Sequence, residues 1–322
     1  MQTAKQKVLA QLEAHRGEAL SGEALAAELN VSRTAVWKAV KDLQKEGHRI
    51  TAVPSKGYTL EQTSGLLTEP GIRRHLRHSG LCVVIEKELV STNTTARELA
   101  AKGAGHGTLV LAEHQTGGRG RRGRSFCSPE STGLYLSMIL RSPLPMEKVV
   151  LTTSAAAVAV CHAVQRVTGR ELSIKWVNDL FYKGRKCCGI LTEAAADMET
   201  GGLDHLVVGV GLNLCPPEGG WPEEIKDIAG SLFESGEHPD RQMLAAAIAD
   251  ELLDLFEALP DTSFMEEYRA RNLVPGRDIQ ILQNGESRPA HADFINDEGH
   301  LMVTLPSGEA EEISFGEVSI RF

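Results

Sequence analysis

The chain opens with three short runs in which apolar residues recur at helical spacing, followed by two strand-like runs. The first helical run covers residues 4–14, and Ser21 and Ser32 stand where N-cap residues would begin the second and third. Two short helices separated by a tight turn predict a helix-turn-helix. The runs Ile50–Val53 and Tyr58–Leu60 flank a Pro-Ser-Lys-Gly turn, which predicts a β-hairpin, or wing.

A polar segment, residues 61–70, separates this head from a longer region and predicts a linker. From about residue 71 to 272, strand-like runs alternate with helical runs, which predicts a mixed α/β domain within an α+β chain. The predicted strands are Leu81–Ile85, Thr108–Ala112, Leu134–Leu140, Leu172–Trp176, Gly189–Glu193 and Leu206–Leu214, and the predicted helices are 93–102, 146–168 and 240–259.

In the last 50 residues, the pattern of apolar and polar positions changes again. Four short strand-like runs, Asp278–Leu282, Arg288–Ile295, His300–Leu305 and Glu311–Ser314, are separated by turns that contain glycine. This pattern predicts a small antiparallel barrel. The sequence therefore predicts three domains, over residues 1–64, 70–272 and 273–322.

Composition narrows the class of protein. Of 322 residues, 42% are apolar and 24% charged, which is typical of globular chains. No uncharged apolar run reaches 18 residues, which argues against a membrane span, and the first 20 residues lack the apolar core of a signal peptide. The six cysteines form no CxxC pair, which argues against a zinc ribbon or a disulfide framework and favours the reducing cytoplasm.

Charge is distributed unevenly along the chain. The net charge is −9, but residues 1–64 carry nine basic and seven acidic residues, so the head is +2 and the remainder −11. Contact with DNA is therefore expected only at the head. The predicted DNA-binding residues lie at the start and outer face of the third helix and on the wing: Ser32, Arg33, Thr34, Trp37, Lys38, Lys41, Arg49 and Lys56. A winged helix that binds protein instead is the alternative.

Four arginines within six residues, interleaved with glycines, form the most informative motif, Gly118–Arg124. Such a density of positive charge requires an anion, the glycines allow the backbone to approach a ligand closely, and guanidinium groups match phosphates. A nucleoside triphosphate is the expected ligand. The motif is neither a P-loop nor GxGxxG. A disordered Arg-Gly segment of the RNA-binding type is the alternative.

Two other groups of polar residues fall in the same region. Ser91-Thr92-Asn93 opens a predicted helix and could hold a small polar head group, or could simply be an N-cap. The segment from Lys175 through Asn178 and Asp179 to Lys186 spans a basic hairpin that offers a cation and a carboxylate. A solvated basic hairpin is the alternative there.

Together these motifs resemble the biotin protein ligases. Gly118–Gly123 reads GRGRRG, Lys175–Asp179 reads KWVND and Lys186–Leu191 reads KCCGIL, with Ser91–Asn93 and Gln115 upstream. With the winged head, the chain resembles the bifunctional ligase and biotin operon repressor type. The resemblance implies a class II synthetase-like central domain and an SH3-like C-terminal domain. Val177 departs from the proline that is frequent in the family.

The resemblance also implies a reaction and its residues. Biotin and ATP condense to biotinyl-5′-AMP, and biotin then passes to a lysine of a biotin carboxyl carrier protein. The implied biotin and adenylate contacts are Ser91, Thr92, Asn93, Gln115, Gly118, Arg119, Gly120, Arg121, Lys186 and Gly189. The implied ATP contacts are Arg121, Arg124, Phe126, Asn178, Asp179 and Asn213. Arg121, Lys186 and Asp179 are the catalytic candidates, and Asp179 could meet nucleotide-bound Mg²⁺.

Phosphoryl chemistry supports these roles, because positive groups must offset the repulsion between a carboxylate and a phosphate. Phe126 or Trp221 could pack on the adenine, and Pro216–Trp221 could close over it. Adenylate binding is expected to produce a homodimer through sheet edges that binds operator DNA. A ligand-sensing regulator without ligase activity and a lipoate-type ligase are the alternatives.

Overall fold

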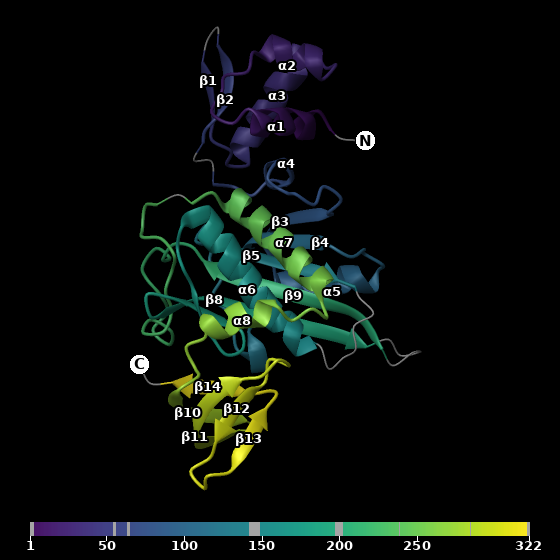
Figure 1. Ribbon diagram of the computed structural model, residues 1–322. Coiled ribbons are helices and arrows are strands. Elements are labelled where there is room, and N and C mark those ends of the chain that lie inside the picture. The colour runs from purple at the N-terminus through teal and green to yellow at the C-terminus, as the bar shows by residue number, and fades with distance from the viewer. Residues whose placement is uncertain are drawn as a thin grey trace. The chain divides into compact units, whose positions relative to one another are not determined.

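The computed structural model describes residues 3–53, 56–62, 65–141, 149–196, 202–237, 239–283 and 285–320. The chain forms two compact units (Figure 1). The first comprises Met1–Ser79 with His238–Ala246, and the second comprises Gly80–Glu237 with Ala247–Phe322.

The first unit begins with the predicted helix-turn-helix and wing. Its elements are α1 (Ala4–Ala14), α2 (Gly22–Glu28), α3 (Arg33–Lys45), β1 (Ile50–Val53) and β2 (Gly57–Leu60). The inner faces of the helices bury Val8, Leu12, Leu25, Val36 and Leu43 in one apolar cluster. The Ser21 and Ser32 hydroxyls cap α2 and α3 as expected. The helix-turn-helix prediction is confirmed.

The predicted linker is wrong over its second half, because Leu67 and Thr68 are buried. The Thr68 hydroxyl accepts from Gly71 N at 3.1 Å and so begins a short helix, α4 (Glu69–Arg73). The same hydroxyl lies 2.6 Å from Gln242 Oε1, and Gln242 belongs to the same compact unit. Residues 63 and 64 lie outside the described part of the chain.

A seven-stranded sheet forms the centre of the second unit. Its strands follow the order β3-β4-β5-β9-β8-β7-β6, and only the β3–β4 pair is parallel. The strands are β3 (Val83–Leu89), β4 (Thr108–Gln115), β5 (Gly133–Leu140), β6 (Ser173–Lys175), β7 (Asp179–Tyr182), β8 (Arg185–Ala196) and β9 (Leu203–Asn213). The predicted first strand began two residues too early, and β7 was not predicted.

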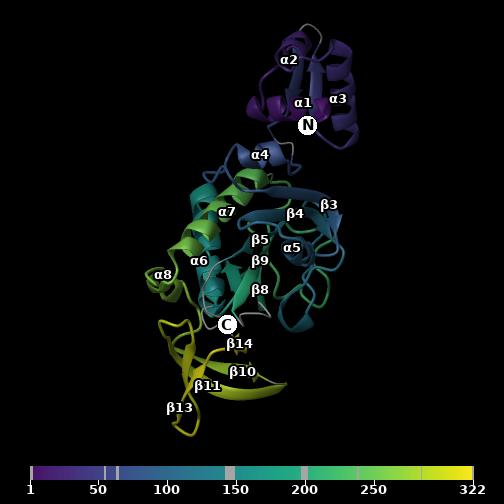
Figure 2. The same ribbon diagram turned by 90° about the vertical axis from the view of Figure 1, so that its right-hand side faces the viewer.

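Helices cover both faces of this sheet, with α5 on one side and α6 and α7 on the other (Figure 2). Their bounds are α5 (Thr92–Ala101), α6 (Val149–Thr168), α7 (Arg241–Ala258) and α8 (Phe264–Ala270). Val150–Thr168 is long and apolar enough to cross a membrane by length and composition, but 67% of that window is buried inside the protein. A helix that is apolar all round and enclosed by other elements is typical of a protein core.

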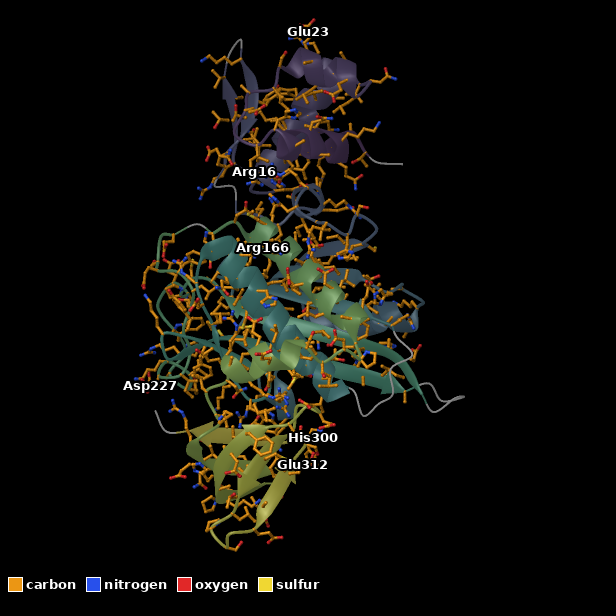
Figure 3. All side chains as sticks on the ribbon, in the orientation of Figure 1. Arg16, Glu23, Arg166, Asp227, His300 and Glu312 are labelled. Atoms are coloured by element: carbon orange, nitrogen blue, oxygen red, sulfur yellow. The ribbon has the colours of Figure 1, made fainter. Side chains whose placement is uncertain are left out.

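The C-terminal strands form a five-stranded antiparallel sheet in the order β13-β12-β11-β10-β14. They are β10 (Arg277–Gln283), β11 (Glu286–Ile295), β12 (Leu301–Thr304), β13 (Ala310–Ile313) and β14 (Glu317–Ile320). The first four match the prediction, and β14 was missed. His300 and Glu312 lie side by side on this sheet, 2.6 Å apart at Nδ1 and Oε1 (Figure 3). The Trp176 indole N–H donates to Gly299 O at 3.0 Å, which attaches the sheet to the strand β6 region.

Candidate active site

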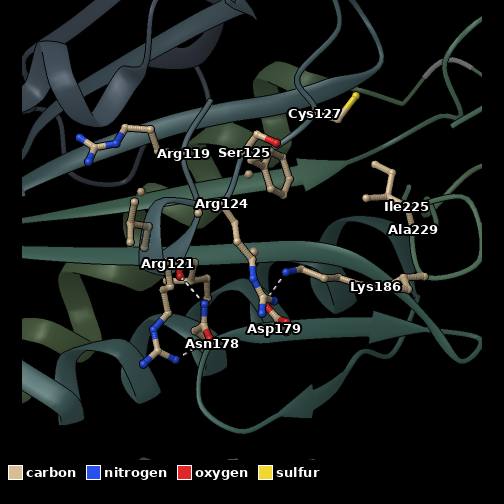
Figure 4. Close-up of a pocket in the computed structure, with 18 of the residues that line it drawn as sticks. Arg119, Arg121, Arg124, Ser125, Cys127, Asn178, Asp179, Lys186, Ile225 and Ala229 are labelled. Carbon is tan, nitrogen blue, oxygen red and sulfur yellow. Dashed lines mark hydrogen bonds and ion pairs between the residues drawn. The ribbon is translucent and has the colours of Figure 1, made fainter. Parts of the chain in front are cut away.

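A cavity of about 450 Å³ lies in the second unit, where the central sheet meets the arginine-rich loop and strand β14 (Figure 4). All the predicted biotin and ATP contacts line it except Gly118. A Cβ at Gly118 would lie 2.4 Å from Phe126 O, so this glycine permits close packing of the loop on itself.

One end of the cavity is lined by hydroxyl and amide groups. Ser91 occupies the N-cap position of α5, yet its side chain makes no capping hydrogen bond, so the simple N-cap interpretation is wrong. The Thr92 backbone N–H donates instead to Gln115 Oε1 at 2.8 Å, and Gln115 Nε2 donates to Ser128 Oγ at 2.8 Å. These two bonds fix the Gln115 amide and leave its second N–H as a donor.

The arginine-rich loop is an ordered turn. Gly120 N donates to Arg124 O at 2.7 Å, and Phe126 N donates to Gly118 O at 2.8 Å. Arg122 has φ 54° at the tip, in the left-handed region that few non-glycine residues adopt. The interpretation as a disordered Arg-Gly segment is therefore wrong.

Three arginines of the loop are each held by an acceptor from a different strand or loop. Arg119 Nη1 lies 3.8 Å from Glu193 Oε1, and Arg124 Nη2 lies 2.7 Å from Glu317 Oε2. Between them, Arg121 donates to Asn178 Oδ1 at 3.1 Å. Burial lowers the pKa of Arg121, and Glu317 and Asp179 act in the opposite direction. The loop's positive charge is thus partly balanced by acceptors within the protein.

The second cationic group comes from the β6–β7–β8 meander. Lys183 and Gly184, with φ of 48° and 76°, form the turn that brings Lys186 back beside β7. Lys186 Nζ lies 2.6 Å from Asp179 Oδ1, inside the cavity (Figure 4). Burial also lowers the pKa of Lys175, which lines the same wall. The hairpin is therefore part of the cavity and not simply a solvated surface feature.

Glycines shape the floor of the cavity. Gly189 and Gly211 face each other across β8 and β9, and a Cβ at Gly211 would lie 2.5 Å from the Phe126 ring. A Cβ at Gly209 would lie 2.0 Å from Asn93 Oδ1. Larger side chains at these positions would displace the groups that line the cavity.

Sequence reasoning missed several lining residues. Lys175 stands in a motif that was recognised, but it received no role of its own. Glu317, Val318 and Ser319 come from β14 and had no signal in the sequence, because that strand is short and pairs with β10, about 40 positions earlier in the chain. Trp221 lines the cavity as suggested, and Asn213 Nδ2 donates to Gly230 O at 3.0 Å, which holds the loop beyond it.

Metal-binding capacity at the cavity is limited. Within the described residues, no group of three or more His, Cys, Asp and Glu side chains is arranged to hold a metal ion. The carboxylates on the cavity wall are Asp179 and Glu317, and each is paired with a cation. These residues fit a magnesium ion held mainly by a bound triphosphate, with one carboxylate at most from the protein.

The head presents a separate cationic surface. Arg33, Thr34 and Trp37 on α3 line a groove together with Lys56 of the wing. Trp37 is 54% exposed, which is unusual for so large an apolar side chain. Lys38, Lys41 and Arg49 are also exposed. Ser32 is exposed as well, but its hydroxyl accepts from Ala35 N at 3.1 Å and so serves as the helix cap.

Comparison with known proteins identifies the family. Residues 87–213 match the biotin/lipoate A/B protein ligase family, and residues 5–59 match an HTH domain. The bifunctional ligase/repressor BirA of Bacillus spizizenii is 39% identical over 324 residues, which cover 96% of each chain. The chain belongs to the biotin/lipoate A/B protein ligase family. BirA of Escherichia coli is 29% identical over 310 residues, covering 95% of this chain and 94% of that protein.

A solved structure of this family supports the fold assignment. Biotin protein ligase from Aquifex aeolicus in complex with biotin and ATP superposes with a TM-score of 0.63 at 27% identity. The match covers 74% of this chain and 98% of that one. The α+β architecture, with an N-terminal helix-turn-helix and a central ligase fold, is therefore confirmed.

Proposed function

We propose that the cavity activates the carboxylate of biotin with ATP and that the chain then transfers biotin to a lysine of a biotin carboxyl carrier protein. As a member of this family, the chain is a biotin–protein ligase and a DNA-binding repressor. The observation that supports the site assignment is the polarity of the cavity. A hydroxyl and amide end at Ser91–Asn93 and Gln115 leads to a cationic end at Arg121, Arg124 and Lys186.

In the first step, a carboxylate oxygen of biotin attacks the α-phosphorus of ATP, and the bond to the β-phosphate breaks to release pyrophosphate. Both reactants are anions, so the barrier includes their mutual repulsion. Arg121 and Lys186 offset that repulsion and stabilise the charge that spreads over the phosphoryl oxygens. A triphosphate carries more negative charge and more acceptor oxygens than Asn178 or Asp179, so it can compete with them for these cations.

In the second step, a lysine amine of the carrier attacks the acyl carbon, and AMP departs with the bonding electron pair. No nucleophile of the enzyme is required. Burial raises the pKa of Cys187 and Cys188 above the ordinary thiol range, so both stay protonated and structural. Once Lys186 turns to phosphate, the Asp179 carboxylate is placed to accept the proton that the incoming amine must lose.

ATP and biotin are the substrates, and a Mg²⁺ ion would be held mainly by the nucleotide. Asp179 would hold the ion on the protein side, and when bound the ion would neutralise the leaving pyrophosphate. Gly118 contributes by allowing the loop to fold tightly, and Phe126 and Trp221 supply apolar surface for the adenine.

The head extends the proposal to DNA. Ser32 caps α3, and Arg33, Thr34 and Trp37 face base edges while Lys38, Lys41, Arg49 and Lys56 contact phosphates. Operator binding requires two half-sites, so the adenylate-bound chain forms a homodimer. We assign the three domains to residues 1–64, 70–272 and 273–322, with an SH3-like C-terminal barrel. The six free thiols fit a cytoplasmic location.

The direct test of activation is isotope exchange between pyrophosphate and ATP. The proposal predicts exchange that requires biotin and is not supported by lipoate. Exchange without biotin, or exchange driven equally by lipoate, would contradict the substrate assignment. Sedimentation with and without biotin plus ATP tests the dimer, and an unchanged monomer in both would contradict it.

A further inference from the structure

The hydroxyl and amide end of the cavity is backed by a second layer of polar side chains that does not line the cavity. Ser137 on β5 is fully buried, and Glu193 lies on β8. Asn93 connects both to the cavity wall, and the residue is 3% exposed.

The orientation of the Asn93 amide is fixed by two acceptors. Asn93 Nδ2 donates to Glu193 Oε2 at 2.9 Å and to Leu191 O at 3.2 Å. Neither partner can donate a proton, since one is a carboxylate and the other a backbone carbonyl. Glu193 is held in place by Arg97, whose Nη1 lies 2.9 Å from Oε1. Asn93 Oδ1 must therefore point the other way, toward Ser137.

The Asn93 oxygen then determines the direction of the Ser137 hydroxyl. Ser137 Oγ lies 2.6 Å from Asn93 Oδ1 and 2.7 Å from Thr92 Oγ1. A hydroxyl has one proton, and an amide oxygen only accepts, so Ser137 donates to Asn93. With that proton committed to Asn93, the Ser137 oxygen is left as an acceptor 2.7 Å from the Thr92 hydroxyl.

Thr92 is consequently left as an acceptor on the cavity side. Its other polar neighbour, Gln115 Oε1 at 3.2 Å, is also only an acceptor. Whichever of these two oxygens takes the Thr92 proton, that proton points into the protein and a lone pair faces the cavity. Beside it, the second N–H of Gln115 is available as a donor. An acceptor next to a donor is complementary to a group that carries adjacent N–H and C=O, as a cyclic urea does.

We propose that Ser137 and Asn93, oriented by Glu193 and Leu191 O, are positioning residues that commit the Thr92 proton inward and so select ligands with an N–H at this point. The proposal rests on the proposed function, because it takes the cyclic urea of biotin as the group that enters this end. Neither Ser137 nor Glu193 lines the cavity, so neither is expected to touch the ligand itself.

The test measures the affinity of the whole chain by calorimetry for biotin and for two cyclic carbamates, each with one ring N–H replaced by oxygen. In the carbamate whose ring oxygen replaces the N–H beside Thr92, a lone pair of that oxygen would face a lone pair of the Thr92 hydroxyl. The parent is expected to bind that carbamate at least about 100-fold more weakly than biotin. In Ser137→Ala, the Thr92 hydroxyl loses the nearer of its two inward acceptors and keeps only the longer contact with Gln115 Oε1, so it can turn toward the ring oxygen, and the ratio is expected to fall about tenfold.

Thr92→Val provides a second variant with the same expectation, since it removes the lone pair and retains the shape of the side chain. Thr192→Val is the matched control. Thr192 stands next to Glu193 on β8, bonds Thr153 Oγ1 at 2.9 Å and does not line the cavity, so the ratio should stay at the parent value.

A parent that fails to discriminate against either carbamate would overturn the relay. So would a ratio within twofold of the parent in folded Ser137→Ala, or in Thr92→Val if Ser137→Ala does not fold. A parent that binds no biotin at all would instead contradict the proposed function, so the two failures are distinguishable.

Discussion

The molecule has two cationic surfaces, and they differ in whether the basic side chains are paired with carboxylates of the protein. On the head, Arg33, Lys38, Lys41, Arg49 and Lys56 are exposed, and none of them forms an ion pair with another described residue. In the cavity, Arg119, Arg124 and Lys186 each pair with a carboxylate of the protein.

Under the proposed function, the difference follows from what each surface would bind. The phosphates of a duplex are spread along a line and are met by exposed cations that were solvated beforehand, so binding is sensitive to salt. A triphosphate enters an enclosed site, where unbalanced cations would destabilise the fold in the absence of ligand. Asn178, Asp179 and Glu317 bind these cations when no ligand is present, and each can be exchanged for a phosphate oxygen. The cations of the cavity would therefore exchange acceptors within the protein for phosphates of the ligand. The cations of the head would gain phosphate partners without giving up a partner in the protein.

Replacing Arg121 should have the largest effect. Arg121→Ala is expected to lower the rate of adenylate formation by about 10²–10³-fold, as loss of one fixed transition-state donor does, and to speed adenylate release. Pyrophosphate exchange and the decay of bound adenylate measure the two effects. Arg122→Asn is the matched control, because Arg122 is exposed at the loop tip and asparagine tolerates its φ of 54°. Equal losses in both variants would contradict a specific role for Arg121.

A buried pair in the head sharpens the comparison, because there the charge serves structure. The Glu13 and Arg16 side chains are 1% and 6% exposed and lie 2.8 Å apart. Glu13→Ala leaves a buried guanidinium without its carboxylate, so the free energy of unfolding is expected to fall by about 3 kcal/mol. Urea unfolding followed by circular dichroism measures it. Glu13→Gln keeps an acceptor for Thr68 and should lose less; an equal loss would mean that charge is not the cause.

The cavity floor should be less tolerant than glycines elsewhere. Gly209→Ala places a Cβ 2.0 Å from Asn93 Oδ1, so we expect a loss of about 1–3 kcal/mol in stability together with weaker biotin binding. Gly105→Ala is the control, because a Cβ there meets nothing within 4 Å. Thermal melting and calorimetric titration with biotin test both variants. Unchanged biotin affinity in Gly209→Ala would contradict the assignment of this floor.

The smallest effects are expected on the head. Lys38→Ala and Lys41→Ala should each weaken binding to duplex DNA by a similar factor whatever its sequence, and should reduce the slope of log affinity against log salt by about one. Fluorescence anisotropy at several salt concentrations measures the slope, and the exchange reaction serves as control since it should not change. An unaltered slope would show that α3 does not face phosphates.

Much of the fold and of the candidate site could be predicted from the sequence, because most of the elements are formed by residues that are close together along the chain. Val36, Val40 and Leu43 recur at helical spacing, and the turn at Lys183-Gly184 connects neighbouring strands. Ser91–Asn93, the arginine-rich loop and the Lys175–Asp179 motif are each contiguous, so residue type and spacing were enough to select them. Their convergence on one cavity was expected only through the family resemblance.

The features that could not be predicted from the sequence depend on contacts between residues that lie far apart along the chain. Thr68 looks like part of a polar linker, but it is buried, and its hydroxyl meets Gln242 and Glu13, which lie far from it along the chain. Glu317 reaches the cavity because β14 pairs with β10, and no local pattern marks that register. The role of Ser137 depends on Asn93 and Glu193, which lie 44 and 56 positions away from it along the chain.

The central claim is that the cations of the cavity exchange their carboxylate partners within the protein for the acyl phosphate of the reaction intermediate. It is tested most directly by incubating the chain with ATP, biotin and a carrier domain and then measuring the intact mass of the carrier. The account predicts the gain of one biotin on one lysine, dependent on ATP and greatly slowed by Arg121→Ala. A carrier of unchanged mass, in a reaction where the protein is folded and binds biotin, would contradict it.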